Sequence, residues 1–365
     1  MSATSNSAKV ASGMRSAHPR EVLLGAQGVS GVLPVCDHYS GVEARMRKSL
    51  QLQADLSAHY GNCVMDVTLD CEDGAPVGGE HDHAQMVLAL AKDAQAKSLR
   101  SSVPARIAVR VHPVDHPAFE SDVATLVGGA ASLWCHVMIP KVESLADVQR
   151  AAAAVDAAAH GAKGVLPLHA LIESPAAVHR AFDIAAHPRV QSLSFGLMDF
   201  VSAHGGAIPA SAMSFQPAGS EPDQFSHPLV LRAKLAIASA CHAHGKVPSH
   251  CVVTEFKDPA VMAAAARKAA RELGFTRMWS IHPDQIAPIL QAMAPSDAEI
   301  EQSARIIEAA GAAQWAPVSV AGQLHDRASY RYFWQVLERA HQTGRALPSS
   351  MQAYFSAAGV AAGVA

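Results

Sequence analysis

Two short apolar stretches of the chain each lead into a carboxylate. Residues 168–172 run into Glu173, and residues 190–195 are followed closely by Asp199. Both stretches have the composition of short strands, so each acid would lie near a C-terminal strand tip. Hard oxygen ligands from neighbouring strand ends suit a divalent ion such as Mg²⁺, which takes one or two carboxylates and completes its shell with water and substrate. Acids at strand–helix junctions also cap helices, so the pair alone leaves both roles open.

The composition bounds the class of protein. The 365 residues are 50% hydrophobic and 17% charged, with a formal net charge of −3. Such a chain can bury a large core, which favours one large α/β domain with an appendage. The near-neutral balance gives no electrostatic footprint for nucleic acid, and no apolar run is long enough to span a bilayer. Six scattered cysteines without a C-x-x-C pair predict free thiols in a reducing, cytoplasmic setting.

Apolar strand-like segments alternate with helix-like ones along most of the chain. The strand-like runs are continuously apolar, as expected for strands covered on both faces. Repeated β-then-α units over about 250 residues predict an α/β fold of the (β/α)₈ TIM-barrel type. A doubly wound sheet is less favoured, because no Gly-rich phosphate fingerprint follows the first strand. The predicted strands are residues 31–35, 64–69, 107–111, 133–139, 165–172, 190–195, 247–253 and 278–281.

The flanking segments differ from the barrel in composition. Residues 1–20 are rich in Ser and Ala and contain no acid, which predicts a disordered N-terminus, with a transit peptide as the alternative. The barrel is expected over residues 21–295. Residues 296–345 are predicted to form a C-terminal helical lid, and residues 346–365 a flexible tail.

The ends of the predicted strands carry most of the ionisable residues that adjoin apolar runs. In barrel enzymes the chemistry lies at these C-terminal ends. A cluster of carboxylates around an Arg and a Lys is costly unless a metal and an anionic ligand balance it. The residues on this predicted rim are Asp70, Glu72, Asp73, Arg110, His112, Lys141, Glu173, Asp199, Glu255 and His282.

Six segments in register give the chain a family resemblance. Between about residues 60 and 335 the chain resembles the citrate lyase β-subunit and malyl-CoA lyase family, which includes the HpcH/HpaI 2-oxo-acid aldolases. Any one of the motifs would be weak alone, whereas six in order are a strong signal. They are Asp-Cys-Glu-Asp-Gly-Ala at 70–75, Val-Arg-Val at 109–111, Ile-Pro-Lys-Val-Glu at 139–143, Ile-Glu-Ser-Pro at 172–175, Phe-Gly-x-x-Asp at 195–199 and Ile-His-Pro-x-Gln-Ile at 281–286.

The resemblance implies a Mg²⁺-dependent barrel, with Mn²⁺ as an alternative ion, that makes or breaks a carbon–carbon bond next to an enolate. The substrate it implies is a β-hydroxyacyl-CoA ester such as a malyl-CoA-like or citryl-CoA-like thioester. By motif match, Glu173 and Asp199 would ligate the metal, and Arg110 would bind the oxo or carboxylate end of the substrate. Arg110 suits a carboxylate because its planar fork binds in a bidentate manner. A structural ion pair between Arg110 and Asp70 or Glu72 is the alternative for this residue.

Further residues take roles from the same resemblance. Glu72 and Asp73 would hold metal-bound water beside the substrate, and Lys141 completes the predicted substrate-binding set. Residues 318–326 resemble the family's C-terminal lid, with Gln323 in place of its Lys. Asp326 would be the catalytic acid or base of that lid; an exposed turn aspartate is the alternative.

Large aromatic residues concentrate near the C-terminus, at positions 315, 330 and 332–334. This is the composition of an interface core, and together with the resemblance it predicts a homotrimer or hexamer in which Asp326 reaches a neighbour's barrel. Two other functions stay open: an aldolase acting on free 2-oxo acids through a pyruvate enolate, and a non-catalytic family member. None of the histidines lies in the H-E-x-x-H motif of a zinc-binding helix.

Overall fold

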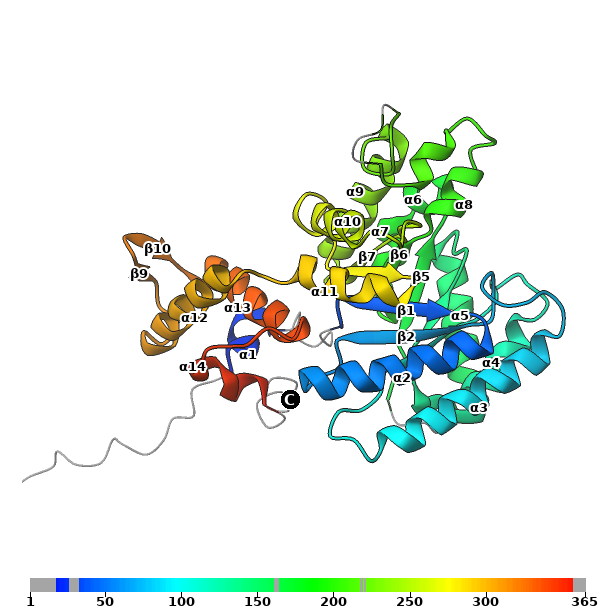
Figure 1. Ribbon diagram of the computed structural model, residues 1–365, viewed down its shortest axis with the longest axis horizontal. Coiled ribbons are helices and arrows are strands. Elements are labelled where there is room, and N and C mark those ends of the chain that lie inside the picture. Colours follow the sequence, from blue (N-terminus) through cyan, green and yellow to red (C-terminus); the bar gives the residue numbers. More distant parts are fainter. Residues whose placement is uncertain (1–17, 26–32, 161–163, 217–218, 220, 357–365) are drawn as a thin grey trace, which may run out of the picture. The chain divides into compact units, whose positions relative to one another are not determined.

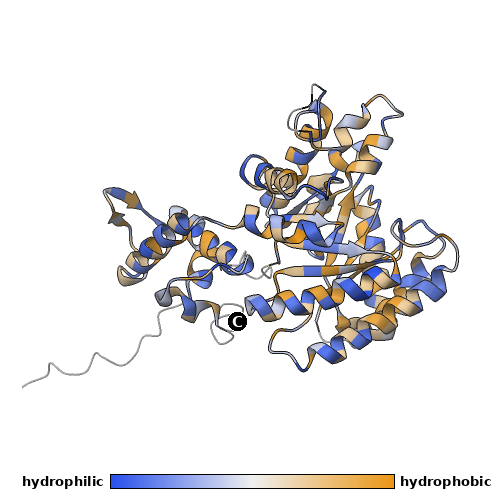
Figure 2. Ribbon diagram, in the orientation of Figure 1, coloured by the Kyte–Doolittle hydropathy of each residue, from blue (hydrophilic) through white to orange (hydrophobic). Residues whose placement is uncertain are grey.

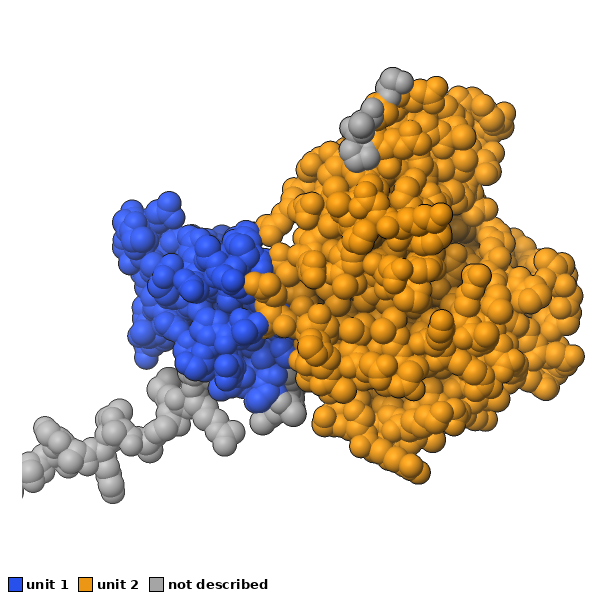
Figure 3. Space-filling model, viewed as in Figure 1, with its two compact units in different colours: residues 1–31, 295–341, 346–365 blue, residues 32–294, 342–345 orange. Residues whose placement is uncertain are grey.

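A computed structural model describes residues 18–25, 33–160, 164–216, 219 and 221–356. The chain divides into two compact units (Figure 3). One unit combines residues 1–31, 295–341 and 346–365, and the other comprises residues 32–294 and 342–345. Within the described residues, no helix has the length and apolar character needed to cross a membrane.

The larger unit is a closed barrel of parallel strands in sequential order, which confirms the predicted (β/α)₈ fold (Figure 1). Closure comes from the pairing of the first and last strands, where Cys36 lies opposite Met278. The strands are β1 Cys36–Ser40, β2 Met65–Asp70, β3 Ile107–Arg110, β4 Trp134–Ile139, β5 Leu168–Ile172, β6 Val190–Phe195, β7 Val247–His250 and β8 Arg277–Ser280.

Helices follow the strands and cover the outside of the barrel. Figure 2 shows hydrophilic and hydrophobic residues alternating along α2 and α3, as expected for helices with one buried face. The helices of this unit are α2 Glu43–Tyr60, α3 Glu80–Ser98, α4 Phe119–Ala130, α5 Leu145–Ala158, α6 Pro175–His179, α7 Ala181–Ala186, α8 Leu197–Ser202, α9 Pro228–Ala243, α10 Pro259–Arg271 and α11 Ile286–Met293, with 3₁₀ turns η2 Ala131–Leu133, η3 Ala210–Met213 and η4 Pro283–Gln285.

Side chains alternate between the two faces of each strand, and this alternation divides the core. Val109 and Leu193 belong to the large apolar cluster that also contains residues of the surrounding helices. Met138, Leu171 and Trp279 form a separate apolar cluster. A charged network also lies in the barrel: the Arg277 guanidinium pairs with two buried aspartates on β1 and β2. The barrel core is therefore partly polar.

The first strand differs from its prediction. The apolar run at residues 31–35 predicted a strand, but β1 begins at Cys36, and residues 31–32 lie outside the described part of the chain. β1 contains polar residues whose partners lie far away in sequence: Asp37 pairs with Arg277, and His38 Nδ1 lies 3.0 Å from Ser280 Oγ. These partners allow polar side chains in a buried strand. Hydrophobicity alone therefore placed the strand five residues too early. The helical segment after β5 is divided into two, α6 and α7, by the non-helical ψ of 9° at Arg180.

The smaller unit packs helices around aromatic residues. Tyr330 and Trp334 of the helix at residues 327–342 are buried together with Ile307 and Leu337. Its elements are α1 Pro19–Leu24, α12 Asp297–Ala312, β9 Val318–Val320, β10 Gln323–His325, α13 Arg327–Gln342, α14 Ser349–Gln352 and the 3₁₀ turn η5 Ala353–Phe355. β9 and β10 form an antiparallel hairpin within the segment predicted to be a helical lid.

Both ends of the chain are more ordered than predicted. Pro19 and Arg20 lie in α1 rather than in a disordered segment, and Arg20 pairs with Glu338. Residues 21–24, predicted to begin the barrel, belong to this smaller unit. The predicted flexible tail forms α14 and η5, because Met351 is buried in the same core. Residues 1–17 and 357–365 lie outside the described residues.

Candidate active site

The parallel strands bring the predicted rim residues to one end of the barrel. Asp70 and Arg110 are the last residues of β2 and β3, and they lie opposite each other in the strand register. Lys141 follows β4, and Glu173 follows β5 directly. Asp199 lies in the first turn of α8, just beyond β6. The sequence therefore predicted the correct end of the barrel for these groups.

Arg110 is held by carboxylates. Its Nε donates to Asp70 Oδ1 at 2.6 Å and its Nη2 to Asp70 Oδ2 at 2.5 Å, while Nη1 lies 3.1 Å from Glu72 Oε2. The rings of Tyr39 and Trp279 lie 5.3 and 5.9 Å from the guanidinium carbon. Burial alone would lower the pKa of Arg110, but the two carboxylates raise it. The structural ion pair considered for this residue is therefore present, and Nη1 is the edge that faces away from Asp70.

Asp70 also organises the loop after β2. Its carboxylate accepts the backbone N–H groups of Glu72 at 3.0 Å and Gly74 at 2.8 Å. A Cβ at Gly74 would lie 2.2 Å from Asp70 Oδ2, so glycine is required for this close approach. The motif at residues 70–75 thus folds around one buried carboxylate that also orients Arg110.

Lys141 contacts three other predicted rim residues. Its Nζ lies 2.5 Å from Glu72 Oε1 and 3.3 Å from Asp73 Oδ2. Its backbone N–H donates to Glu173 Oε2 at 2.7 Å. Lys141 has a φ of 52°, a conformation that is uncommon outside glycine and marks functional or strained positions. The structure therefore brings Glu72, Asp73, Lys141 and Glu173 together.

Glu173 is a buried carboxylate close to a second acid. It is only 6% exposed, and its pKa is raised to about 8, first by burial and second by the charge of Asp199. Gly196 makes room for it, because a Cβ there would lie 2.3 Å from Glu173 Oε1. The half-buried Asp199 carboxylate accepts no hydrogen bond from the part of the chain that the structure describes.

This donor set fits a divalent cation. Glu173 uses Oε2 for the Lys141 N–H, and its Oε1 has no hydrogen-bond partner among the described residues. Two neighbouring carboxylates with uncommitted oxygens are unfavourable without a cation, which the raised pKa of Glu173 reflects. Mg²⁺ typically binds one or two carboxylates and keeps several waters. The chemistry of the pair therefore agrees with the metal-binding role predicted from sequence.

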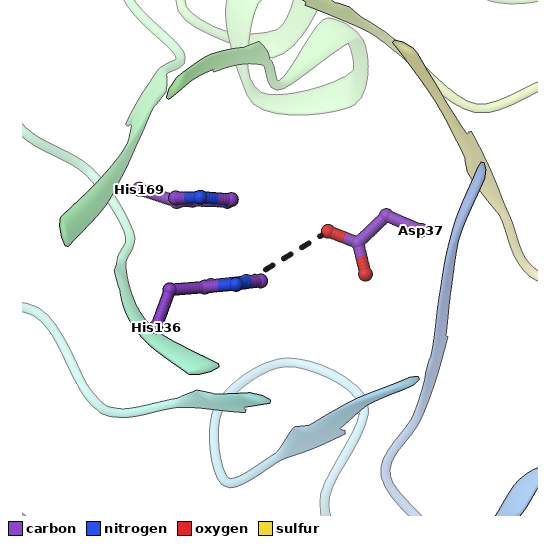
Figure 4. Close-up of side chains that lie close together, drawn as sticks. All are labelled: Asp37, His136 and His169. Carbon is purple, nitrogen blue, oxygen red and sulfur yellow. Dashed lines mark ion pairs between the residues drawn. The ribbon is translucent and has the colours of Figure 1, made fainter. Parts of the chain in front are cut away.

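A second titratable cluster lies inside the barrel and was not predicted. Figure 4 shows Asp37, His136 and His169 together: the two imidazole rings are stacked with centroids 3.4 Å apart, and His136 Nε2 lies 3.9 Å from Asp37 Oδ2. Arg277 Nη2 already contacts Asp37 at 2.8 Å and Asp66 at 2.7 Å. The Arg277 guanidinium already supplies a positive charge to the two aspartates. The rings of His136 and His169 are stacked and nearly parallel, so they do not converge on one point as two ligands of one ion would. This cluster therefore suits a divalent cation less well than the rim does.

Asp326 belongs to the smaller unit. Its exposed carboxylate Oδ1 accepts the N–H groups of Ala328 at 2.9 Å and Ser329 at 3.3 Å, and Ser329 Oγ lies 3.1 Å from the Asp326 N–H. These bonds cap the first turn of α13. Within its own unit, Asp326 therefore has the role of a helix cap. The residue is exposed, as in the alternative of an exposed turn aspartate.

Residues 53–283 match the family model of the HpcH/HpaI aldolase/citrate lyase family, which covers more than half of the chain. The chain belongs to this family. Relatives of this chain are named carbon–carbon lyases, and the resemblance predicted from the six motifs is confirmed.

Three relatives show the range of this HpcH/HpaI family. The L-malyl-CoA/β-methylmalyl-CoA lyase of Rhodobacter capsulatus is 32% identical over 64% of this chain and 76% of its own length. A crystal structure of a citrate lyase from Burkholderia xenovorans LB400 is 46% identical, covers 92% of this chain and 99% of that one, and has a TM-score of 0.73. The citrate lyase β subunit of Mycobacterium tuberculosis in complex with oxaloacetate and magnesium shares the fold, with 22% identity, a TM-score of 0.52, and coverage of 72% and 98%.

Proposed function

We propose that the protein is a Mg²⁺-dependent lyase that cleaves, or forms by condensation, a β-hydroxyacyl-CoA thioester through an enolate. The observation that carries the proposal is the Glu173–Asp199 pair, whose free oxygens lie on the same rim as Arg110 and Lys141. The malyl-CoA lyase of R. capsulatus, at 32% identity, supports a thioester substrate of this size. The magnesium in the M. tuberculosis structure supports the choice of ion; Mn²⁺ offers similar coordination chemistry.

In this proposal Glu173 and Asp199 hold the ion, which when bound acts as a Lewis acid on substrate oxygens. The other rim residues orient the substrate. Arg110 Nη1 lies on the edge of the guanidinium away from Asp70, 3.1 Å from Glu72 Oε2, and would share that edge with the oxo or carboxylate end. Lys141 balances Glu72 and Asp73, which would hold water beside the reacting carbons. Tyr39 and Trp279 restrict the rotation of Arg110, so its fork is preorganised.

The test is incubation of the purified protein with Mg²⁺ and a panel of β-hydroxyacyl-CoA esters and free hydroxy oxo-acids, with products identified by mass spectrometry. The proposal expects an acyl-CoA and an oxo-acid or aldehyde from at least one thioester. Cleavage of free acids alone would establish the aldolase alternative. No product from any substrate, in either direction, would favour a non-catalytic family member.

We also propose a homotrimer or hexamer in which Asp326 acts on a neighbouring subunit's barrel. The exposed position of Asp326 and the exposed Leu324 and Tyr332 beside it support an interface there. Asp326→Asn preserves the helix cap while removing the charge. The inactive Asp326→Asn and Glu173→Gln variants are then mixed and reassembled. Partial activity should return, because some sites then combine an intact metal pair from one chain with an intact Asp326 from another. No recovery in verified hetero-oligomers would contradict catalysis in trans.

A further inference from the structure

His112 and Asp122 form a buried pair beside the proposed site. His112 lies two residues beyond Arg110, the last residue of β3, and Glu72 is a charged neighbour of both residues. Asp122 lies in the first turn of α4 and is 1% exposed. Its Oδ2 accepts both the backbone N–H of His112 at 3.0 Å and the ring Nδ1–H at 2.7 Å. The carboxylate thus fixes both the orientation and the tautomer of the imidazole.

The other ring nitrogen is available. With the proton on Nδ1, Nε2 carries the lone pair, and it has no hydrogen-bond partner among the described residues. His112 is 8% exposed, so this edge is close to the surface of the rim and not sealed in the core. An imidazole held at one nitrogen by a buried carboxylate and open at the other is the arrangement of a general base.

The charged neighbours of His112 come from every element around it. Asp122 is on α4, Glu80 is on α3, Glu72 is on the loop after β2, and the ring of His116 stacks on His112 at 4.3 Å. The hydrogen bond to Asp122 raises the pKa of His112, burial opposes the rise, and the charges of Asp122, Glu72 and Glu80 add to it. Glu72 also contacts Arg110 and Lys141, which connects His112 to the proposed substrate-binding residues.

We propose that His112, oriented by Asp122, is a further acid–base residue of the lyase reaction and accepts the proton of the substrate β-hydroxyl at Nε2. The inference rests on the function proposed above. In the cleavage direction the O–H electron pair becomes the carbonyl π bond, and the carbon–carbon pair becomes the enolate. The proton moves to Nε2, and the enolate carbon takes a proton from solvent or from another acid. In condensation His112 returns its proton to the new alkoxide.

A purely structural role makes a different prediction. Asp122 tethers the loop through the backbone N–H of His112, and this bond does not need an imidazole. If tethering were the only role, His112→Asn would keep the loop and leave the pH dependence of turnover unchanged. If His112 is a general base, kcat/KM should fall on the acid side of the pH profile in the wild type. This acid limb should be absent when Asn replaces the imidazole.

The experiment compares pH profiles of kcat/KM for thioester cleavage in the wild type, His112→Asn, Asp122→Asn and the control His81→Asn, an exposed histidine of α3. In the wild type, kcat/KM should fall tenfold per pH unit below the pKa of His112. His112→Asn should lose that limb and be about a hundredfold slower at pH 8, in the range for removal of a general base. Asp122→Asn should move the limb to lower pH, since the loss of the carboxylate lowers the pKa of His112. His81→Asn should match the wild type.

A second readout is independent of activity. NMR titration of ¹³C-labelled histidine should show a His112 resonance whose pKa is higher in the wild type than in Asp122→Asn, in samples whose circular dichroism confirms an intact fold. Unchanged acid limbs in His112→Asn and Asp122→Asn, in a protein that does cleave thioesters, would overturn the role of His112 and leave the proposed function standing. A wild-type protein with no lyase activity on any substrate would overturn both.

Discussion

Glu173 and Arg110 meet opposite electrostatic conditions within one rim. Burial and the neighbouring Asp199 make the charged form of Glu173 unfavourable, whereas Asp70 and Glu72 stabilise the charge of Arg110. Carboxylates of the protein therefore balance the charge of Arg110, whereas no neighbouring cation among the described residues comparably balances the charges of Glu173 and Asp199. At the scale of single residues, this difference supports the proposed position of a cation beside Glu173.

Glu173→Gln should abolish stabilisation by Mg²⁺. The wild-type melting temperature should rise with MgCl₂ in a thermal-shift titration, and that of the variant should not, because the isosteric amide fills the same space but is a poor ligand for a hard ion. Glu120→Gln, at an exposed acid of α4, is the matched control and should respond like the wild type. Equal responses of wild type and Glu173→Gln would contradict metal binding at this pair.

The metal-free protein gives a second prediction about the same residue. The pKa of Glu173 in the folded protein, about 8, lies above its ordinary value of 4.5. Between these two pH values the folded state therefore binds more protons than the unfolded chain. The titration of Glu173 therefore lowers the free energy of unfolding as pH rises from about 4.5 to 8. In a chelator, urea unfolding should therefore show Glu173→Gln gaining stability relative to the wild type between pH 5 and pH 8. A constant difference over that range would show that Glu173 titrates normally.

Arg110→Lys should reduce turnover by about a hundredfold or more, since Lys keeps the charge but loses the planar fork that both Asp70 and a carboxylate substrate require. Steady-state kinetics should be measured well below the melting temperature of the variant, because the substitution also weakens the buried pair with Asp70. Near-normal kcat/KM in the Lys variant would mean that Arg110 acts only as a point charge.

At the scale of elements, the site depends on how closely strand tips approach the next segment. The turn from β6 into α8 passes so close to Glu173 that no Cβ fits at Gly196. The turn after β4 places Lys141 at positive φ so that its N–H reaches the same carboxylate. Two turns on either side of β5 thus position one side chain.

Gly196→Ala should weaken Mg²⁺ binding by about 10- to 100-fold, the range for disturbing the support of a ligand. Its φ of −88° is open to alanine, so the effect comes from contact with the Glu173 carboxylate and not from backbone strain. Isothermal titration with Mg²⁺ measures it. Gly311→Ala, where a Cβ meets nothing within 4 Å, is the control. Unchanged affinity in Gly196→Ala would show that Glu173 can move without consequence.

The fold was more predictable from sequence than the site. Seven of the eight strands were predicted near their observed positions, because strands covered on both faces are rich in apolar residues even where they also carry a buried polar side chain. β1 was misplaced because Asp37 is satisfied by Arg277, which is distant in sequence. The rim residues were predictable, since parallel strands end together. The Asp70–Arg110 pair was predicted only as the alternative role of Arg110, and the His112–Asp122 pair was not predicted, because each pairing depends on which side chains converge after folding.

At the scale of the whole barrel, a buried polar layer makes the fold sensitive to acid. Burial lowers the pKa of His169 to about 3 and that of His136 well below its ordinary value. The folded protein therefore keeps both rings neutral, while an unfolded chain protonates them below about pH 6.5. Stability from these groups is present above that pH and is lost as the pH falls toward 3.

His169→Asn should make unfolding less dependent on acid. The variant loses packing and is expected to be less stable than the wild type at pH 8, but its free energy of unfolding should fall less between pH 6.5 and pH 4. Urea unfolding at a series of pH values measures this slope. Parallel slopes for the two proteins would show that His169 is not held neutral in the fold.

The central claim is that a metal held by Glu173 and Asp199 enables carbon–carbon cleavage. Its most direct test is the rate of acyl-CoA release from a β-hydroxyacyl-CoA ester, measured in one sample before chelation, after EDTA, and after Mg²⁺ is restored. We predict activity that EDTA removes and Mg²⁺ returns in the wild type, and no activity at any stage in Glu173→Gln. Cleavage that persists in EDTA, or in Glu173→Gln, would contradict this claim.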